Sequence, residues 1–376
     1  MINEELLRER IISVLEEQGF KVNPHVKPWE SNKEAYKGVQ QRSKLEQIAH
    51  HKEFLKKCFE QAKSYCRDGR DIAPGEIKLE LREVKSDSFE EILFRWWNLM
   101  WWSIPYQRSY GRQMRFLLWD SVHHAPFGLI GLQSPVLRMS VRDNALEIPK
   151  DELDIWVNKS MSAQRVGALP PYNELLGGKM VALTLASNEV RDAYKRKYGS
   201  RTTIIKCRQL EPGLLFITTT SAFGKSSLYN RLKYKNEIVA ECLGYTRGSG
   251  SFHISEELYK EILEFLADRG INVARGFGHG PSRKLKLISL GLRYLGLASF
   301  EFHGIKRAFY LFPFVKNLRE VIHQQQKPVW FDHPFYELED YWRERWAMPR
   351  AARKPEWKRF KTAEFFEKAG RMLGKL

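Results

Sequence analysis

The sequence has few cysteines, and their positions form no pattern that holds a metal or a redox disulfide. The chain of 376 residues has four of them. They show neither the close pairs of a zinc ribbon nor a CxxC motif. We therefore expect reduced thiols and no metal site. The four positions are Cys58, Cys66, Cys207 and Cys242.

Long apolar runs are also missing. No stretch approaches the ~20 apolar residues that cross a bilayer, and the first residues, MINEELLRERIISVLEEQGF, interleave charged with apolar side chains. A signal peptide instead carries an uninterrupted apolar core. From these absences we expect a cytoplasmic protein without a membrane partner.

Acidic residues are scarce relative to basic ones. Lysine and arginine number 62 against 45 aspartates and glutamates, which gives a formal net charge of +17. Such an excess attracts polyanions over a Debye length of roughly 8–10 Å. Nucleic acid, and DNA in particular, is the first partner that we expect, with acidic proteins behind it. A basic surface that only keeps the protein in solution is the alternative.

The composition and length indicate a folded protein of several parts. Hydrophobic residues make up 43% of the chain and aromatic residues 13%, which is typical of globular proteins. Hydrophobic periodicity and the positions of Pro and Gly predict the α+β class. The expected parts are a helical N-terminal module (1–88), an α/β core (89–253), a helix plus hairpin (254–348) and a basic amphipathic tail (349–376).

Within the expected core, the short apolar runs RFLLWD and FGLIGL predict an antiparallel hairpin. A helix, two strands, a polar helix and a further strand are expected after it, over 174–198, 203–207, 214–220, 225–233 and 238–245.

In the last third, Ser255 is expected to cap a helix. A second helix leads to SFEFHGIKRAFYLF, which predicts a hairpin over 299–312 that turns at His303 and Gly304. A helix followed by a hairpin is typical of winged-helix domains, many of which bind DNA, although many other α+β domains share this order.

Several long strings resemble a known family over about residues 95–350. They are SIPYQRSYGRQMRFLLWD, LIGLQSPVLRMSVRD, SMSAQRVGALPPYNELLGGKMVALTLASNEV, LLFITTTSAFGKSSLYNRLKY, LGYTRGSGSFHI, GPSRK and HGIKRAFYLF. Together they resemble the A component of the Druantia anti-phage defence system, the DruA family. The resemblance implies a role in resisting phage beside other Druantia proteins, one of which is a large helicase-like protein. It implies no reaction, and the catalytic residues stay unknown.

The order of elements in the core is similar to the acetyltransferase fold, which binds acyl-coenzyme A. In that fold a Q/R-x-x-G-x-G/A loop opens the central helix and holds the pyrophosphate on backbone N–H groups. The corresponding residues here would be Gly177, Gly178 and Lys179, the cofactor-binding residues if acyl-coenzyme A binds. Glu174 and Lys179 depart from the pattern, and we expect no cofactor.

Basic residues in two kinds of segment are the candidates for nucleic-acid binding. Arginine presents a planar fork of donors that suits phosphates and guanine edges, and loops dense in Gly, Pro and Ser are suited to hold functional groups. An ion pair between Arg142 and Asp143 that only fixes a loop is the alternative there. The loop candidates are Arg108, Arg112, Arg138 and Arg142.

The second kind of segment lies in the last third, where helix positions three, four and seven apart share one stripe. Lys306 and Arg307 would flank that stripe in the expected hairpin, and a merely solvated charged face is the alternative. These candidates are Arg283, Lys284, Lys286, Arg293, Lys306 and Arg307.

The string AFGKSS is similar to a P-loop but lacks one of its glycines. A P-loop needs glycine five residues before Gly224 so that backbone N–H groups wrap the phosphates, and that position is Thr219. We interpret Gly224 as a strand-to-helix turn. Lys225, Arg231 and Lys233 would then form a positive face.

Three other features have more than one interpretation each. His123 and His124 beside Asp120 would supply at most one group to a site, because strand neighbours point to opposite faces; a solvated loop is the alternative. Trp96 and Trp97, with the tryptophans at 101 and 102, indicate a buried cluster or a platform for unpaired bases. The amphipathic tail would dock on a partner, clamp nucleic acid or lie on a membrane surface.

Two functions of different class follow. The first is a non-catalytic defence component that binds nucleic acid or a nucleic-acid-bound partner. The alternative is an acyltransferase-like enzyme that uses acyl-coenzyme A to modify a phage or host molecule.

Overall fold

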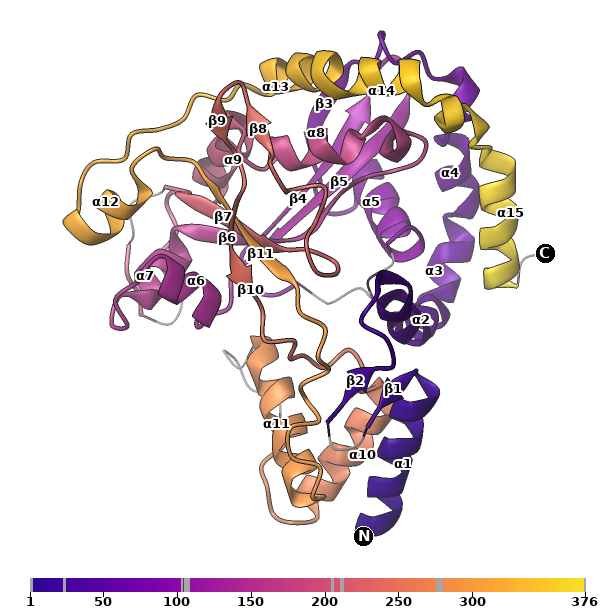
Figure 1. Ribbon diagram of the computed structural model, residues 1–376, viewed down its shortest axis with the longest axis vertical. Helices are drawn as coiled ribbons and strands as arrows, with labels where there is room; N and C mark the ends of the chain where they lie inside the picture. The colour runs from indigo at the N-terminus through magenta and orange to yellow at the C-terminus, as the bar shows by residue number, and fades with distance from the viewer. Residues whose placement is uncertain are drawn as a thin grey trace.

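A large mixed sheet with helices on both faces forms the upper part of the molecule, and a smaller lobe of helices lies below it (Figure 1). This computed structural model describes residues 3–22, 25–102, 104, 109–203, 206–209, 213–274 and 280–374, without the side chains of 280–282. The expected α+β class is confirmed.

The sheet has seven strands in the order β10-β11-β7-β6-β5-β4-β3. Neighbouring strands are antiparallel, except that β6 and β7 are parallel. The strands are β3 (Leu79–Glu83), β4 (Gln113–Asp120), β5 (Ala125–Gln133), β6 (Ser160–Ala168), β7 (Phe216–Thr220), β10 (Glu241–Tyr245) and β11 (Ala308–Pro313). The position of β11 between β7 and β10 brings the last third of the chain into the core sheet.

Polar N-caps fix where several helices begin. Asn3, Asn32, Ser88, Ser187 and Ser255 each accept a hydrogen bond from a first-turn N–H. The helices are α1 (Glu4–Glu17), α2 (Lys33–His50), α3 (Lys52–Lys57), α4 (Phe59–Ser64), α5 (Phe89–Met100), α6 (Ser140–Ala145), α7 (Leu153–Asn158), α8 (Gly177–Thr184), α9 (Asn188–Tyr198), α10 (Glu256–Ala267), α11 (Gly280–Tyr294), α12 (Leu318–Gln324), α13 (Phe335–Trp342), α14 (Met348–Arg353) and α15 (Thr362–Leu373). Among the described residues, none of these helices has the length and apolar content needed to cross a bilayer.

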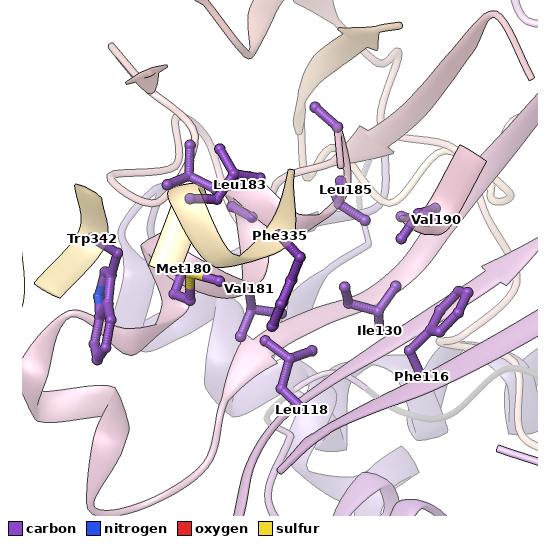
Figure 2. Packing of buried hydrophobic residues seen from close by; sticks show 14 of the residues in the cluster. Phe116, Leu118, Ile130, Met180, Val181, Leu183, Leu185, Val190, Phe335 and Trp342 are labelled. Atoms are coloured by element: carbon purple, nitrogen blue, oxygen red, sulfur yellow. The ribbon is translucent and has the colours of Figure 1, made fainter. Parts of the chain in front are cut away.

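The largest core cluster fills the sheet face under α8 and α13 (Figure 2). Phe116 and Leu118 of β4 alternate toward this face, where they meet Val181 of α8 and Phe335 of α13. Burial of each such side chain stabilises the fold by about 1.5–3 kcal/mol. The short helical segment Arg343–Ala347 continues from α13 to α14, so the C-terminal third closes the core that the middle of the chain begins.

The opposite face carries the tryptophans of α5, and the C-terminal tail covers them. Trp96 stacks on Phe366 with ring centroids 5.0 Å apart, and Trp97 stacks on Phe365 at 5.3 Å. Both tryptophans are fully buried. The buried interpretation of these two tryptophans is therefore confirmed, and the apolar face of α15 packs on the protein's own helices.

In the lower lobe, the first helix of the chain packs against two helices from the last third of the chain. Leu7, Ile11 and Leu15 of α1 belong to one buried cluster with Ile262 of α10 and Ile288 of α11. The two-stranded ribbon β1–β2 (Phe20–Lys21, Lys27–Pro28) lies beside them (Figure 1). The N-terminal helix thus depends for its burial on residues more than two hundred positions away.

Three of the expected elements are wrong. The hairpin over 299–312 is absent, because β11 pairs with β7 and β10 rather than with the segment before it. Turns replace the polar helix over 225–233. Where the range 203–207 is described it contains no strand, and only an isolated bridge joins Thr202 to Gln209.

Two further elements differ in kind from the expectation. The helix over 174–198 is divided into α8 and α9, because Ser187 caps a new helix. The central strand β6 was not expected at all. Its segment, SMSAQRVGA, lacks apolar alternation because polar and small residues are buried within the sheet.

Candidate nucleic-acid interface

Three loops meet at one end of the sheet. They are 221–227 after β7, 246–251 after β10, and 303–307 before β11. Because β11 is antiparallel to both other strands, its start lies beside their ends. Hydrogen bonds join the loops: Gly224 N donates to Lys306 O at 3.1 Å, and Thr246 N donates to Arg307 O at 2.9 Å.

Glycine permits this close approach of backbones. Gly248 has φ of 77°, which other residues rarely adopt, and a Cβ there would lie 3.0 Å from the carbonyl carbon of Gly304. Gly304 N donates to Gly248 O at 3.1 Å. We call the three joined segments the loop junction.

The loop junction itself carries cations that have no acidic partners among the described residues. Lys225, Arg247 and Lys306 are exposed, and no ion pair involves them in the part of the chain that the structure describes. Glu301, the acidic residue closest in sequence to 303–307, instead accepts a hydrogen bond from Ser289 of α11 at 3.1 Å. The junction therefore presents positive charge that the fold itself does not neutralise.

Arg307 is the most unusual of these cations. Its side chain is partly buried, and its Nε atom is fully buried without a hydrogen-bond partner among the described residues. Burial lowers the pKa of Arg307 from its ordinary value. An enclosed cation without a counter-charge is unfavourable, so an anion from outside the protein would be stabilised here.

Two histidines pack under the loop junction. His253 Nε2 donates to the Phe300 carbonyl at 2.8 Å, and the Ile305 N–H donates to His303 Nδ1 at 3.1 Å. Burial lowers the pKa of His253 to about 4 and that of His303 to about 3. Both are therefore neutral at pH 7, and they support the loops rather than add charge.

A hollow of about 360 Å³ opens beside the junction. Lys33 and Tyr36 of α2 line one side, and residues 222–227 line the other. The sequence prediction missed Lys33, Tyr36 and Arg247. The sequence contains a signal for the helix that carries Lys33 and Tyr36, because asparagine is a preferred N-cap residue. In the structure Asn32 accepts a hydrogen bond from Ala35 N at 2.8 Å at the start of α2.

Two of the expected loop arginines have structural partners. Arg142 is buried, and its guanidinium donates to Asp143 and to the carbonyls of Val136 and Leu137 at 2.7 to 3.0 Å. The alternative of an ion pair that fixes the loop therefore describes Arg142. Arg112 donates to the carbonyls of residues 157, 158 and 160 and to the hydroxyl of Tyr194.

The α11 candidates divide in the same way. Arg283 donates to the carbonyls of residues 272 and 274, and Lys284 pairs with Glu256 at 2.6 Å. Lys286 and Arg293 are exposed, as are Arg138, Arg231 and Lys233 in other segments. Arg108 lies outside the described residues. The structure thus brings together Lys225, Lys306 and Arg307, which the sequence had placed in two separate groups.

The first turn of α8, which corresponds to the pyrophosphate-binding turn of the acetyltransferase fold, is covered by other residues. A Cβ on Gly178 would lie 2.8 Å from a methyl carbon of Leu228, and one on Gly177 would lie 2.7 Å from a main-chain oxygen. Lys179 Nζ donates to the carbonyl of Ser227 at 3.2 Å. These contacts leave little room for a pyrophosphate at this helix end.

The carboxylate and histidine between β4 and β5 are also fully bonded. Asp120 is buried and binds His123 Nδ1 at 2.6 Å and the Tyr172 hydroxyl at 2.8 Å. The Ala73 N–H donates to His123 Nε2 at 3.0 Å, so that nitrogen is an acceptor already in use. His123 therefore fixes the loop and has no free nitrogen for general-base chemistry.

The fold and the loop junction together define a mixed α+β protein. At one end of its sheet, loops that contain glycine form a basic surface. The model of the family "Druantia protein DruA" matches residues 30–324. The chain is 31% identical over 342 residues to the Druantia protein DruA of Escherichia coli (strain UMEA 4076-1), covering 90% of this chain and 84% of the relative. It belongs to the DruA family. No solved structure matches it.

Proposed function

We propose that this protein is a non-catalytic, nucleic-acid-binding component of a Druantia anti-phage defence system, and that DNA is its ligand. The DruA family is a component of that system, so the defence role follows from membership. Other Druantia proteins, including the helicase-like one, are its proposed partners.

The enclosed, unpaired cation of Arg307 is the observation that supports binding most directly. It lies among Lys225, Arg247 and Lys306, which are exposed and without ion pairs in the described chain. Phosphates of nucleic acid are the commonest anions that such a group of side chains meets. The net charge of +17 adds a long-range attraction.

A salt series tests this proposal. Binding of single-stranded and duplex DNA is measured by fluorescence anisotropy, and we expect the logarithm of affinity to fall linearly with the logarithm of salt concentration. In the double variant Lys225→Glu, Lys306→Glu, the slope should fall by about 1.8 for duplex DNA and by about 1.4 for a single strand, because each lost phosphate contact removes about 0.9 or about 0.7.

The control is Lys150→Glu, Lys327→Glu, which reverses two exposed lysines near α7 and α12. This variant changes the net charge by the same amount away from the junction. Equal weakening by both variants would mean that only overall charge matters. A flat salt response of the unmodified protein would refute nucleic-acid binding altogether.

The acyltransferase alternative keeps one supporting observation. The hairpin β4–β5, the helix α8 and the strands β7 and β10 follow in the order that is similar to the acetyltransferase fold. However, Trp102 lies against Gly167 of β6, where a Cβ would be 3.1 Å from its ring, and Leu228 covers Gly178. Saturable binding of acetyl-coenzyme A in calorimetry would restore this alternative.

A further inference from the structure

We propose that the hollow between α2 and the loop 221–227 receives an unpaired base of a single nucleic-acid strand. The inference rests on the proposed function, because it specifies which form of nucleic acid the loop junction binds. It adds a recognition site formed by Lys33, Tyr36, Phe223 and Lys225, all of which line the hollow.

Two aromatic rings line this hollow. The ring centroids of Tyr36 and Phe223 are 6.0 Å apart and their planes are inclined by 31°. Both side chains are partly exposed. Aromatic faces of this kind stack on the faces of bases, and the stacking tolerates any base sequence because every base has such a face.

Two lysines border the same rings. Lys33 begins α2 one turn before Tyr36, and Lys225 follows Phe223 by two residues. Neither lysine has an ion pair in the portion of the chain that the structure describes. A base stacked in the hollow would have its flanking phosphates beside these two ammonium groups. The combination of an aromatic face and flanking cations is typical of single-strand binding sites.

The dimensions of the hollow favour a single strand over a duplex. Its volume of about 360 Å³ is near the lower end of the roughly 300–1,000 Å³ of small-ligand pockets. In a duplex the base faces are covered by their neighbours in the stack, so that only base edges and phosphates are accessible. A base enters this hollow only when it is unpaired.

The tryptophans of α5 do not offer the same chemistry. Trp96 and Trp97 are fully buried against α15, so they have no face for a base. Tyr36 and Phe223 come from segments about 190 residues apart, and only the packing of the lower lobe under the sheet brings them together.

The test compares a single-stranded oligonucleotide with a duplex of the same sequence and length. The variant Tyr36→Leu, Phe223→Leu keeps apolar volume in the hollow but removes both aromatic faces. We expect its affinity for the single strand to fall about tenfold, while affinity for the duplex changes less than about twofold. A matched control is Tyr336→Leu, which removes an exposed ring on α13.

A second measurement does not depend on affinity alone. A 2-aminopurine base in the single strand should lose fluorescence on binding to the unmodified protein, because the base stacks on its aromatic rings. It should keep its fluorescence on binding to the Leu variant, which has no ring in the hollow. An RNA strand of the same sequence, measured alongside, identifies which sugar is preferred, and preference for either single strand over its duplex supports the proposal.

The outcomes separate the two proposals. One outcome refutes the base site but leaves nucleic-acid binding standing. In that outcome the protein binds DNA and the variant Lys225→Glu, Lys306→Glu abolishes this binding. Duplex and single strand are nevertheless bound equally, and the Leu variant has no effect on either. If no strand binds at low salt, both proposals fail together.

Discussion

The segment around Arg142 and the loop junction around Arg307 each place an arginine among serines, but the two arginines differ in what they bond. Ser140 begins α6 two residues before Arg142, and Ser249 and Ser251 lie in the junction. The guanidinium of Arg142 is fully bonded, to Asp143 and to two carbonyls. That of Arg307 has no hydrogen-bond or ionic partner among the described residues.

The difference arises from where the nearby carbonyls point. In the first loop the chain turns back on itself, so that the carbonyls of residues 136 and 137 face their own arginine. At the junction the main-chain groups bond to one another across strands, as Thr246 N does to Arg307 O. The donors of the Arg307 side chain are consequently left for an external anion. The comparison indicates that unused hydrogen-bond donors, rather than local composition, distinguish a binding arginine from a structural one.

The largest effect that would test this comparison is expected from Arg142→Met. Methionine keeps most of the apolar stem but leaves Asp143 and the carbonyls of residues 136 and 137 without their donor. Breaking a buried pair costs about 3–5 kcal/mol, so the free energy of unfolding in urea should fall by about that amount. Arg138→Met, an exposed neighbour, should change it by less than about 0.5 kcal/mol. A similar small change for both would mean that Arg142 does not hold the loop.

A smaller loss of stability is expected on lowering the pH, because the two histidines under the junction are buried in their neutral form. Folded His253 and His303 have pKa values of about 4 and about 3, against an ordinary value of 6.5. Below pH 6.5 the unfolded chain therefore binds more protons than the folded one, and stability falls as the pH falls. Between neutral pH and about pH 5 the loss is about 2 kcal/mol for each histidine.

Urea unfolding at several pH values checks this expectation. In His303→Asn the amide oxygen replaces Nδ1 as acceptor for the Ile305 N–H, and no group at that position titrates. The loss between neutral pH and about pH 5 should then be smaller by about 2 kcal/mol than in the unmodified protein. An unchanged pH dependence would show that the pKa of His303 is the same in the folded and the unfolded chain.

Local patterns predicted those parts of the fold that depend on local chemistry. The hairpin β4–β5 and the helix capped by Ser255 are confirmed. Strand β6 escaped prediction because its polar residues bond to nearby main chain, as Ser160 Oγ does to Trp156 O at 2.9 Å. The expected hairpin at His303 failed because β11 has its partners in segments far away in the sequence.

The candidate site was predicted in fragments for the same reason. The sequence predicts Lys225 on a positive face after the turn at Gly224, and Lys306 and Arg307 in a hairpin beside a basic helix, but nothing local indicates that β7 and β11 lie side by side. Lys33 and Tyr36 join the site through the lower lobe, whose core unites α1 with α10 and α11. Contacts of such long sequence separation cannot be read from periodicity or capping, which report only nearby residues.

The smallest effect on stability, and the one that sharpens the comparison most, is expected from Arg307→Met. Since the guanidinium has no partner to lose, its removal should change the free energy of unfolding by less than about 1 kcal/mol, in contrast to the same substitution at Arg142. Affinity for DNA should fall about tenfold, and the salt slope should decrease by about 1, because one phosphate contact is lost. Anisotropy and urea unfolding of the two variants in parallel measure both quantities. A loss of stability at Arg307 as large as that at Arg142, with DNA binding unchanged, would make Arg307 a structural arginine and leave the junction without its central cation.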